Sequence, residues 1–107
     1  MVLTVLDRLM IINFLLPKEG NAVTLRLRTE MVGKIGLSKE EFESFEVVSL
    51  PNGGINWNHL VDQGTEIPLG ETELKLIREV VTGLERSSKL PMDCLPIYEK
   101  LMAEAEK

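Results

Sequence analysis

The chain has 107 residues, of which 44% are hydrophobic and 27% are charged, and its formal net charge is −5. This composition fits one folded domain over residues 1–107 with its own core, and it excludes both wholesale disorder and a general polyanion binder. With one cysteine and one histidine, the chain also lacks the residues for an internal disulfide, for most catalytic triads and for a Cys/His-rich zinc site.

Residues 3–16, LTVLDRLMIINFLL, form the most apolar run of the chain. Thr4 and Asp7 have the spacing of a capping box at the start of a helix. Pro17 and Gly20 then end the helical pattern. The run predicts a first helix of about 12 residues that is buried on nearly every face.

This apolar run is too short to cross a membrane, because a spanning helix needs about 20 apolar residues. It also lacks the positively charged flank and the small-residue cleavage site of a signal peptide. Together with the single cysteine, these features predict a cytoplasmic protein.

Residues 21–36 fit two interpretations. Val23, Leu25 and Leu27 alternate with polar residues, as in a half-buried strand. Val23, Leu27, Met31 and Ile35 instead form a helical stripe, with Asn21 and Gly36 placed as its caps. The length of the stripe and its caps favour a helix, although a partial strand stays open.

Ser38 and Glu41 form the cleanest capping box of the sequence. It predicts a short helix from about Lys39 to Ser44 that buries Phe42 and Phe45.

Residues 46–58 carry the signature of a β-hairpin. Two β-prone runs, 46–50 and 55–58, flank Pro51-Asn52-Gly53-Gly54, and Asn-Gly favours the positive φ angles of tight turns. We expect Trp57 to pack one face of this hairpin against a helix.

The remaining segments predict a loop, an edge strand and two helices. Residues 59–64 are the loop, and residues 65–69 are the edge strand, since Pro68 cannot donate to a central ladder. A helix then begins after Gly70 with an apolar stripe of Leu74, Ile77, Val80, Val81 and Leu84. The last helix begins near Asp93, buries Ile97, Tyr98, Leu101 and Met102, and ends in a solvated AEAEK segment. The predicted fold is α+β and mostly helical, with about five helices and a small antiparallel sheet in the middle.

Few residues suggest catalysis or metal binding. His59 and Asp62 have H-x-x-D spacing, but a solvated loop histidine explains His59 more simply than a metal ligand does. Cys94 lies near a helix start, where a thiol pKa can fall, yet such a cysteine is more often a small apolar residue. We therefore expect no enzyme and assign no catalytic, cofactor-binding or metal-binding residues; an enzyme with a site near His59 or Cys94 is the third hypothesis.

A nucleic-acid binder is the main alternative. Residues 18–39 carry five basic side chains against two acidic ones. Three helices followed by a hairpin is also the order of a winged-helix domain, for which Arg26, Arg28, Lys34 and Lys39 are the candidate contacts. The third helix opposes this hypothesis, because its four nearby glutamates would repel a phosphate backbone.

The opening of the chain resembles a group of small phage- and prophage-encoded proteins of uncharacterised function. The resemblance is carried by Leu3-Thr4-Val5-Leu6-Asp7-Arg8-Leu9, Leu16-Pro17-Lys18-Glu19-Gly20-Asn21 and Thr24-Leu25, with echoes at Ser38-Lys39-Glu40-Glu41, Trp57-Asn58 and Tyr98-Glu99-Lys100. It implies a phage origin, and hence a bacterial host cell, but brings no substrate, cofactor or site residue.

The hypothesis that remains is assembly. A nearly all-apolar first helix and a methionine-rich interior suit a subunit whose core extends across an interface. We expect a small non-enzymatic protein that acts through protein–protein contacts, a phage accessory or assembly factor, with self-association or another protein as its partner.

Overall fold

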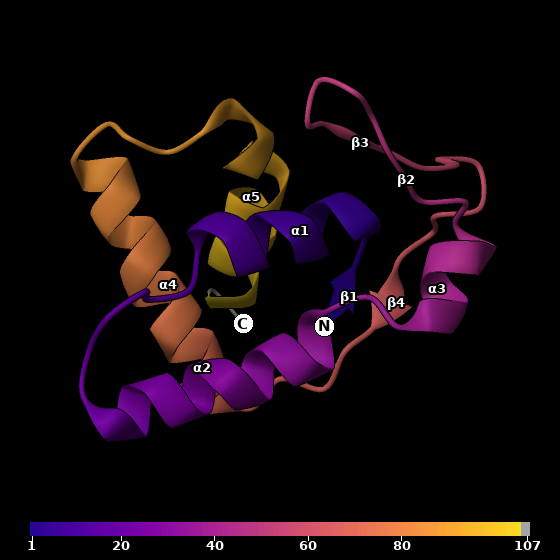
Figure 1. Ribbon diagram of the computed structural model, residues 1–107. Coiled ribbons are helices and arrows are strands. Elements are labelled where there is room, and N and C mark those ends of the chain that lie inside the picture. Colours follow the sequence, from indigo (N-terminus) through magenta and orange to yellow (C-terminus); the bar gives the residue numbers. More distant parts are fainter. Residues whose placement is uncertain (106–107) are drawn as a thin grey trace.

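The computed structural model describes residues 1–105, which contain five α-helices, one 3-10 helix and two antiparallel sheets of two strands each. The predicted α+β, mostly helical fold is confirmed (Figure 1). In chain order the elements are β1 (Val2–Leu3), α1 (Val5–Phe14), α2 (Ala22–Ile35), α3 (Lys39–Ser44), β2 (Val48–Ser49), β3 (Ile55–Asn56), β4 (Thr65–Glu66), α4 (Glu71–Arg86), η1 (Met92–Cys94) and α5 (Leu95–Ala105).

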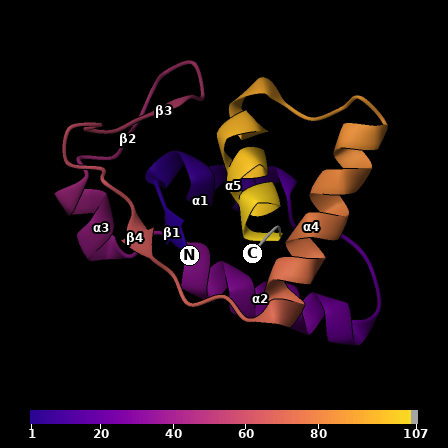
Figure 2. The same cartoon turned by 180° about the vertical axis from the view of Figure 1, so that it is seen from behind.

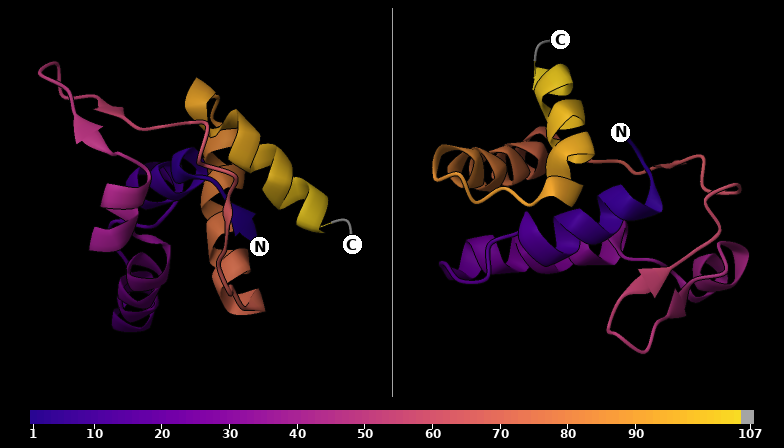
Figure 3. Two further views of the ribbon diagram at one scale, coloured as in Figure 1. Left: turned by 90° about the vertical axis from the view of Figure 1, so that its right-hand side faces the viewer. Right: turned by 90° about the horizontal axis from the view of Figure 1, so that it is seen from above.

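Helix α1 lies at the centre, between α2 on one side and α5 on the other, as the view from above shows (Figure 3, right). Helix α4 packs beside α5, which is clearest from behind (Figure 2). The side chains that are 0% exposed come from all of these elements: Leu3, Ile11, Leu15, Met31, Ile35, Ile77, Val81, Cys94, Ile97 and Leu101. The core therefore gathers around α1.

Helix α1 begins after Thr4, as its capping-box spacing predicts. The hydroxyl of Thr4 accepts a hydrogen bond from the backbone N–H of Asp7, and the Asp7 carboxylate accepts one from that of Thr4. The prediction of near-complete burial is wrong, since Phe14 is 45% exposed while Asp7 and Arg8 are 2% exposed. Both charged residues have partners in other helices.

Helix α2 settles the ambiguity of residues 21–36 in favour of a helix. The side chain of Asn21 accepts a hydrogen bond from the N–H of Thr24, as expected of an N-cap. Gly36 follows the helix but is not left-handed, because its φ of −59° and ψ of 150° are extended.

Only the second half of the apolar stripe of α2 is fully buried. Met31 and Ile35 are fully buried, whereas Val23 is 73% exposed. The first half of α2 extends past the end of α1, so its apolar residues lack the cover that the second half receives (Figure 1).

Helix α3 has the predicted bounds. Ser38 and Glu41 exchange the two hydrogen bonds of a capping box, at 3.1 and 2.9 Å. Phe42 is 46% exposed and not buried as expected, while Phe45 is partly buried.

The predicted hairpin is confirmed, with Val48 opposite Asn56 and Ser49 opposite Ile55. Its turn is not the expected Asn-Gly turn with two positive φ angles. The carbonyl of Leu50 accepts a hydrogen bond from the N–H of Gly53, and Gly53 alone has a positive φ, +85°. A turn centred on Pro51 and Asn52 followed by a left-handed glycine is a common three-residue hairpin loop.

Strand β4 also forms where an edge strand was expected, but its partner is β1, with Val2 opposite Glu66 and Leu3 opposite Thr65. Leu3 is therefore in a strand and not in the first helix. Gly64, with φ of +89°, brings β4 close to β1: a Cβ there would lie 2.5 Å from Cγ1 of Val2.

The last two helices follow their predicted stripes. In α4, Ile77 and Val81 are fully buried. The 3-10 helix η1 leads into α5, in which Pro96 lies in the first turn and Ile97 and Leu101 are fully buried. The last two residues of the expected solvated end, 106–107, lie outside the described residues. None of the helices in residues 1–105 is both long and apolar enough to span a membrane.

Candidate interaction surface

Three ion pairs join the first turn of one helix to a basic residue of another. They are Asp7 with Lys100, Glu41 with Arg8 and Glu73 with Lys34. Each acid is the third residue of its helix and also accepts a hydrogen bond from the backbone N–H of the residue before that helix. A negative charge is favourable there because it faces the positive end of the helix dipole. Each of these ion pairs therefore links the first turn of one helix to a second helix.

Arg8 makes the most extensive of these connections. Its Nε donates to the carbonyl of Ile35 and its Nη2 to that of Gly36, both at 2.7 Å, so it satisfies carbonyls at the end of α2. Its Nη1 and Nη2 bind the two oxygens of Glu41 at 2.5 and 2.8 Å. These hydrogen bonds outweigh the effect of partial burial and lower the pKa of Glu41 to about 2.

Glu73 is also paired with a cation, but Lys34 gives it one hydrogen bond, whereas Arg8 gives Glu41 two. Burial acts to raise its pKa, but the hydrogen bond from the N–H of Gly70 and the Lys34 ammonium at 2.8 Å outweigh burial, so the pKa is lowered. Glycine at this N-cap has no side chain to return the hydrogen bond, so the capping box of α4 is only half formed.

The buried charges fix the orientation of α1. Asp7, Arg8 and Ile11 face the interior, whereas Leu6, Leu9 and Met10 lie on another face of the helix and are partly buried. Met10 still packs against the core. Helix α1 therefore has a second apolar face, which the rest of the described chain covers only in part.

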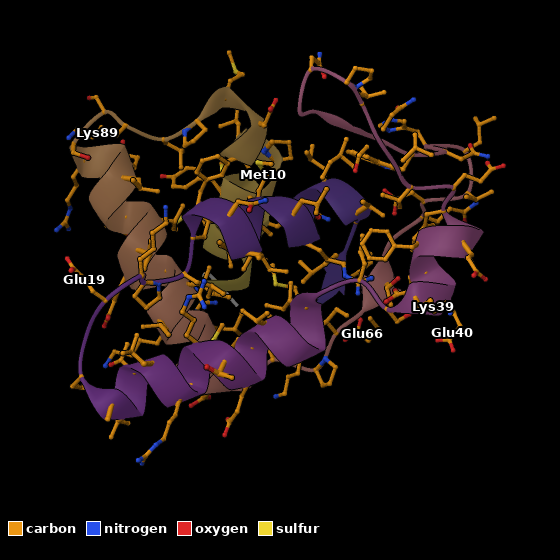
Figure 4. The ribbon with its side chains drawn as sticks, viewed as in Figure 1. Met10, Glu19, Lys39, Glu40, Glu66 and Lys89 are labelled. Atoms are coloured by element: carbon orange, nitrogen blue, oxygen red, sulfur yellow. The ribbon has the colours of Figure 1, made fainter. Side chains whose placement is uncertain are left out.

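The second face of α1 forms one wall of a groove of about 340 Å³. The groove is lined by Leu6, Leu9, Met10 and Asn13 of α1, by Gly53, Gly54, Ile55 and Trp57 of the hairpin, and by Asp93 of η1. In Figure 4, Met10 lies on the upper side of α1, toward the space between the hairpin and the start of α5. The walls thus come from three separate elements.

The groove has apolar side chains from two of its elements. Leu6, Leu9 and Met10 of α1 face Ile55 and Trp57 of the hairpin across it, and Ile55 is 43% exposed. We call the residues that line this groove the α1–hairpin surface. An apolar concave site is typical of an interaction surface, whereas isolated exposed apolar residues are ordinary.

Asp62 holds the hairpin side of the groove against α1. Its carboxylate accepts hydrogen bonds from the backbone N–H of Val5, at 3.0 and 3.2 Å, and from Nε1 of Trp57, at 3.2 Å. His59 stacks on Trp57 with ring centroids 4.6 Å apart and a tilt of 30°. Trp57 is thereby linked to the start of α1 through Asp62, and its expected packing against a helix stays a prediction.

The other hollows are less suited to binding. One of them, about 440 Å³, is lined by residues of α4 alone, among them Lys75, Arg78 and Arg86. One helix cannot provide opposing walls, and long charged side chains are mobile. Two further hollows between α2 and α4 include Thr72 and have volumes of 280 and 240 Å³.

The four basic residues of the nucleic-acid hypothesis do not lie together on one surface in the structure. Arg26 and Arg28 are 200° apart around α2, Arg26 lining a hollow beside α4, and Lys34 is paired with Glu73. Lys39 lies at the far end of the molecule beside Glu40 (Figure 4). That hypothesis still predicts salt-dependent DNA affinity that falls when Arg26 and Arg28 are replaced by alanine.

The two residues of the enzyme hypothesis, Cys94 and His59, have different environments. Cys94 is fully buried, and burial together with the charge of Asp93 raises the pKa of its thiol, which opposes the reactive thiolate form. His59 is exposed and stacked on Trp57. Residues 1–105 contain no group of three His, Cys, Asp or Glu side chains placed to hold a metal ion.

The sequence indicates one wall of this surface, because the nearly all-apolar first helix suggests an interface. It does not indicate that the hairpin and η1 supply the other walls, since that depends on how these segments pack beside α1.

Comparisons with protein-family models, with curated proteins and with solved structures find no match to this chain.

Proposed function

We propose that this chain is a small non-enzymatic protein that acts through protein–protein contacts and associates with itself. One observation supports it most: the open groove beside α1 is lined mainly by apolar residues, among them Leu6, Met10 and Ile55. Exposing a contiguous apolar surface to water is unfavourable, and covering it drives association.

The resemblance of the opening residues to phage- and prophage-encoded proteins supports a more specific proposal. The chain is then a phage accessory or assembly factor acting in the cytoplasm of a bacterial host. An assembly factor needs a surface that binds another protein, and it needs no catalytic group.

Light scattering over a range of protein concentrations tests self-association. We expect a discrete oligomer that persists on dilution and is not weakened by moderate salt, because an apolar interface is not held by screened charges. A monomeric mass at every concentration, in low and in high salt, would contradict the proposal.

A further inference from the structure

Strand β3 borders the groove of the α1–hairpin surface. Ile55 of β3 and Trp57, which follows it, line the groove, whereas no residue of β2 is among the described residues that line it. The groove therefore lies on the side of β3 that β2 leaves open. The free backbone groups along such an open edge can pair with another chain.

The register of the hairpin fixes which backbone groups point toward this open edge. In an antiparallel pair, opposite residues alternate between those that exchange hydrogen bonds and those that do not. The N–H of Leu50 donates to the carbonyl of Gly54 at 2.8 Å, so the next pair, Ser49 and Ile55, is of the second kind. The N–H and the carbonyl of Ile55 therefore point away from β2, and by the same alternation those of Trp57 do too.

The two walls of the groove together suit an extended chain. The outward backbone groups of Ile55 and Trp57 have no backbone partner among the described residues. On the other wall, Leu6, Leu9 and Met10 of α1 offer apolar contacts. An extended peptide can pair its backbone with the strand edge while its alternate side chains contact the helix. A helical segment cannot use the edge, because its own backbone groups are already paired.

Asp93 adds a charge preference to the groove. It is the one charged residue among the described residues that line the groove, it is exposed, and it makes no ion pair within the described part of the chain. A lysine or arginine of the occupant can pair with this carboxylate, whereas a second carboxylate would be repelled.

We infer that the α1–hairpin groove binds an extended segment of a partner protein, which adds to the open edge of β3 as a further strand and carries apolar side chains and a lysine or arginine. The inference rests on the proposed action through protein–protein contacts. It adds the mode of binding and the chemistry of the partner.

The probe is a synthetic peptide of about six residues, a common length for a strand, with alternating valine and threonine and one lysine. Two control peptides keep these side chains but carry methyl groups on the backbone nitrogens of one edge or of the other. Trp57 is the single tryptophan of the chain and lines the groove, so its fluorescence measures binding. We expect methylation of one edge to weaken binding at least about tenfold and methylation of the other edge to weaken it by no more than about twofold. Equal affinities of the three peptides, or no binding of the unmethylated one, would overturn strand addition.

Amide hydrogen exchange identifies the edge that the peptide uses. The bound peptide should slow exchange at the amides of Ile55 and Trp57, which point toward the open edge. Exchange at Asn56 should change little, because Asn56 lies opposite Val48 and its amide points toward β2. Equal slowing at all three amides, or slowing at none, would contradict the inference.

Ile55→Pro and Ser49→Pro form a matched pair of variants. Both N–H groups point away from the other strand of the hairpin, so neither proline removes a hydrogen bond between β2 and β3. Ile55→Pro removes a donor on the groove side and should weaken the peptide at least about tenfold, whereas Ser49→Pro removes one on the far edge and should stay within about twofold. Circular dichroism checks that both variants fold, and the methylated peptides test the same edge without altering the protein.

Asp93→Asn tests the charge preference. The unaltered chain should bind the lysine peptide more tightly than a peptide with glutamate in that place, and Asp93→Asn should reduce this difference at least about threefold. An undiminished preference would show that Asp93 does not select the occupant.

The outcomes separate this inference from the proposed self-association. If light scattering shows an oligomer and the peptide does not bind, the inference fails while self-association stands. If the chain is a monomer and the peptide binds by its backbone edge, self-association fails and the inference stands. If the peptide binds only by dissociating an oligomer, the occupant of the groove is a second copy and the assignment to a partner protein is wrong.

Discussion

Arg8 is a charged side chain with 2% of its surface exposed, yet each of its three nitrogens has a hydrogen-bond partner. Burying a charge is unfavourable unless it is paired and hydrogen-bonded, and Arg8 meets both conditions at once. Its planar guanidinium matches the Glu41 carboxylate with two bonds, which a lysine could not reproduce. One residue thereby connects α1, the end of α2 and the start of α3.

We expect Arg8→Ala to lower the free energy of unfolding by about 3–5 kcal/mol, since it leaves Glu41 without its cation and the carbonyls of Ile35 and Gly36 without the donors that Arg8 supplies. Urea unfolding monitored by circular dichroism gives the value. Arg26→Ala, an exposed position, is the matched control and should change stability by no more than about 0.5 kcal/mol. Equal effects of the two variants would contradict this role of Arg8.

The lowered pKa of Glu41 predicts how stability depends on pH. Its folded pKa, about 2, lies below the ordinary value of 4.5, so the stabilisation is fully present above pH 4.5 and is lost as the pH falls toward 2. The loss from this group is at most about 3 kcal/mol. Thermal unfolding between neutral and acidic pH should show a smaller decline for Glu41→Gln, and an unchanged decline would argue against the ion pair.

At the scale of elements, local signals were sufficient for the helix starts. Thr4 with Asp7 and Ser38 with Glu41 lie within one turn of each other, so their spacing in the sequence predicts their contacts. Burial was not predictable in the same way. Whether Asp7 or Phe14 faces inward depends on Lys100 and on the neighbouring helices, which a local window cannot contain.

Replacing Gly64 or Gly33 by alanine should change the stability of the fold in opposite directions. Gly64→Ala should destabilise the fold by about 1–3 kcal/mol, because its φ is +89° and a Cβ would lie 2.5 Å from Val2. Gly33→Ala, with no other atom within 4 Å of its Cβ position, should stabilise α2 by about 0.5–1 kcal/mol. Melting temperatures measure both, and a change of the same sign in both variants would contradict the assignment.

The hairpin is held to α1 by the Asp62 carboxylate. Asp62→Ala should lower stability by about 1–3 kcal/mol, since it leaves the N–H of Val5 and Nε1 of Trp57 without acceptors. It should also expose Trp57 and shift its fluorescence to longer wavelength. Asp62→Asn keeps an acceptor oxygen and should retain most of the native spectrum; an Asp62→Ala spectrum identical to that of the native chain would show that the hairpin is held otherwise.

At the scale of the whole molecule, the sequence predicted the fold class and the order of the elements, but not the candidate surface. Helical periodicity marks Leu6, Met10 and Ile11 alike as apolar and does not tell which of them the chain itself can cover. That depends on how many elements pack around α1. The hairpin, α2, η1 and α5 surround it and leave the groove open.

The ion pair between Asp7 and Lys100 also has a consequence for how the protein is made. Asp7 belongs to α1, which leaves the ribosome well before α5, the helix that contains Lys100. Until α5 emerges, the nascent chain holds a carboxylate with no cation beside it and an apolar helix without its cover. Folding of this domain should therefore reach completion only after α5 has emerged, as one late cooperative step, and not helix by helix along the growing chain.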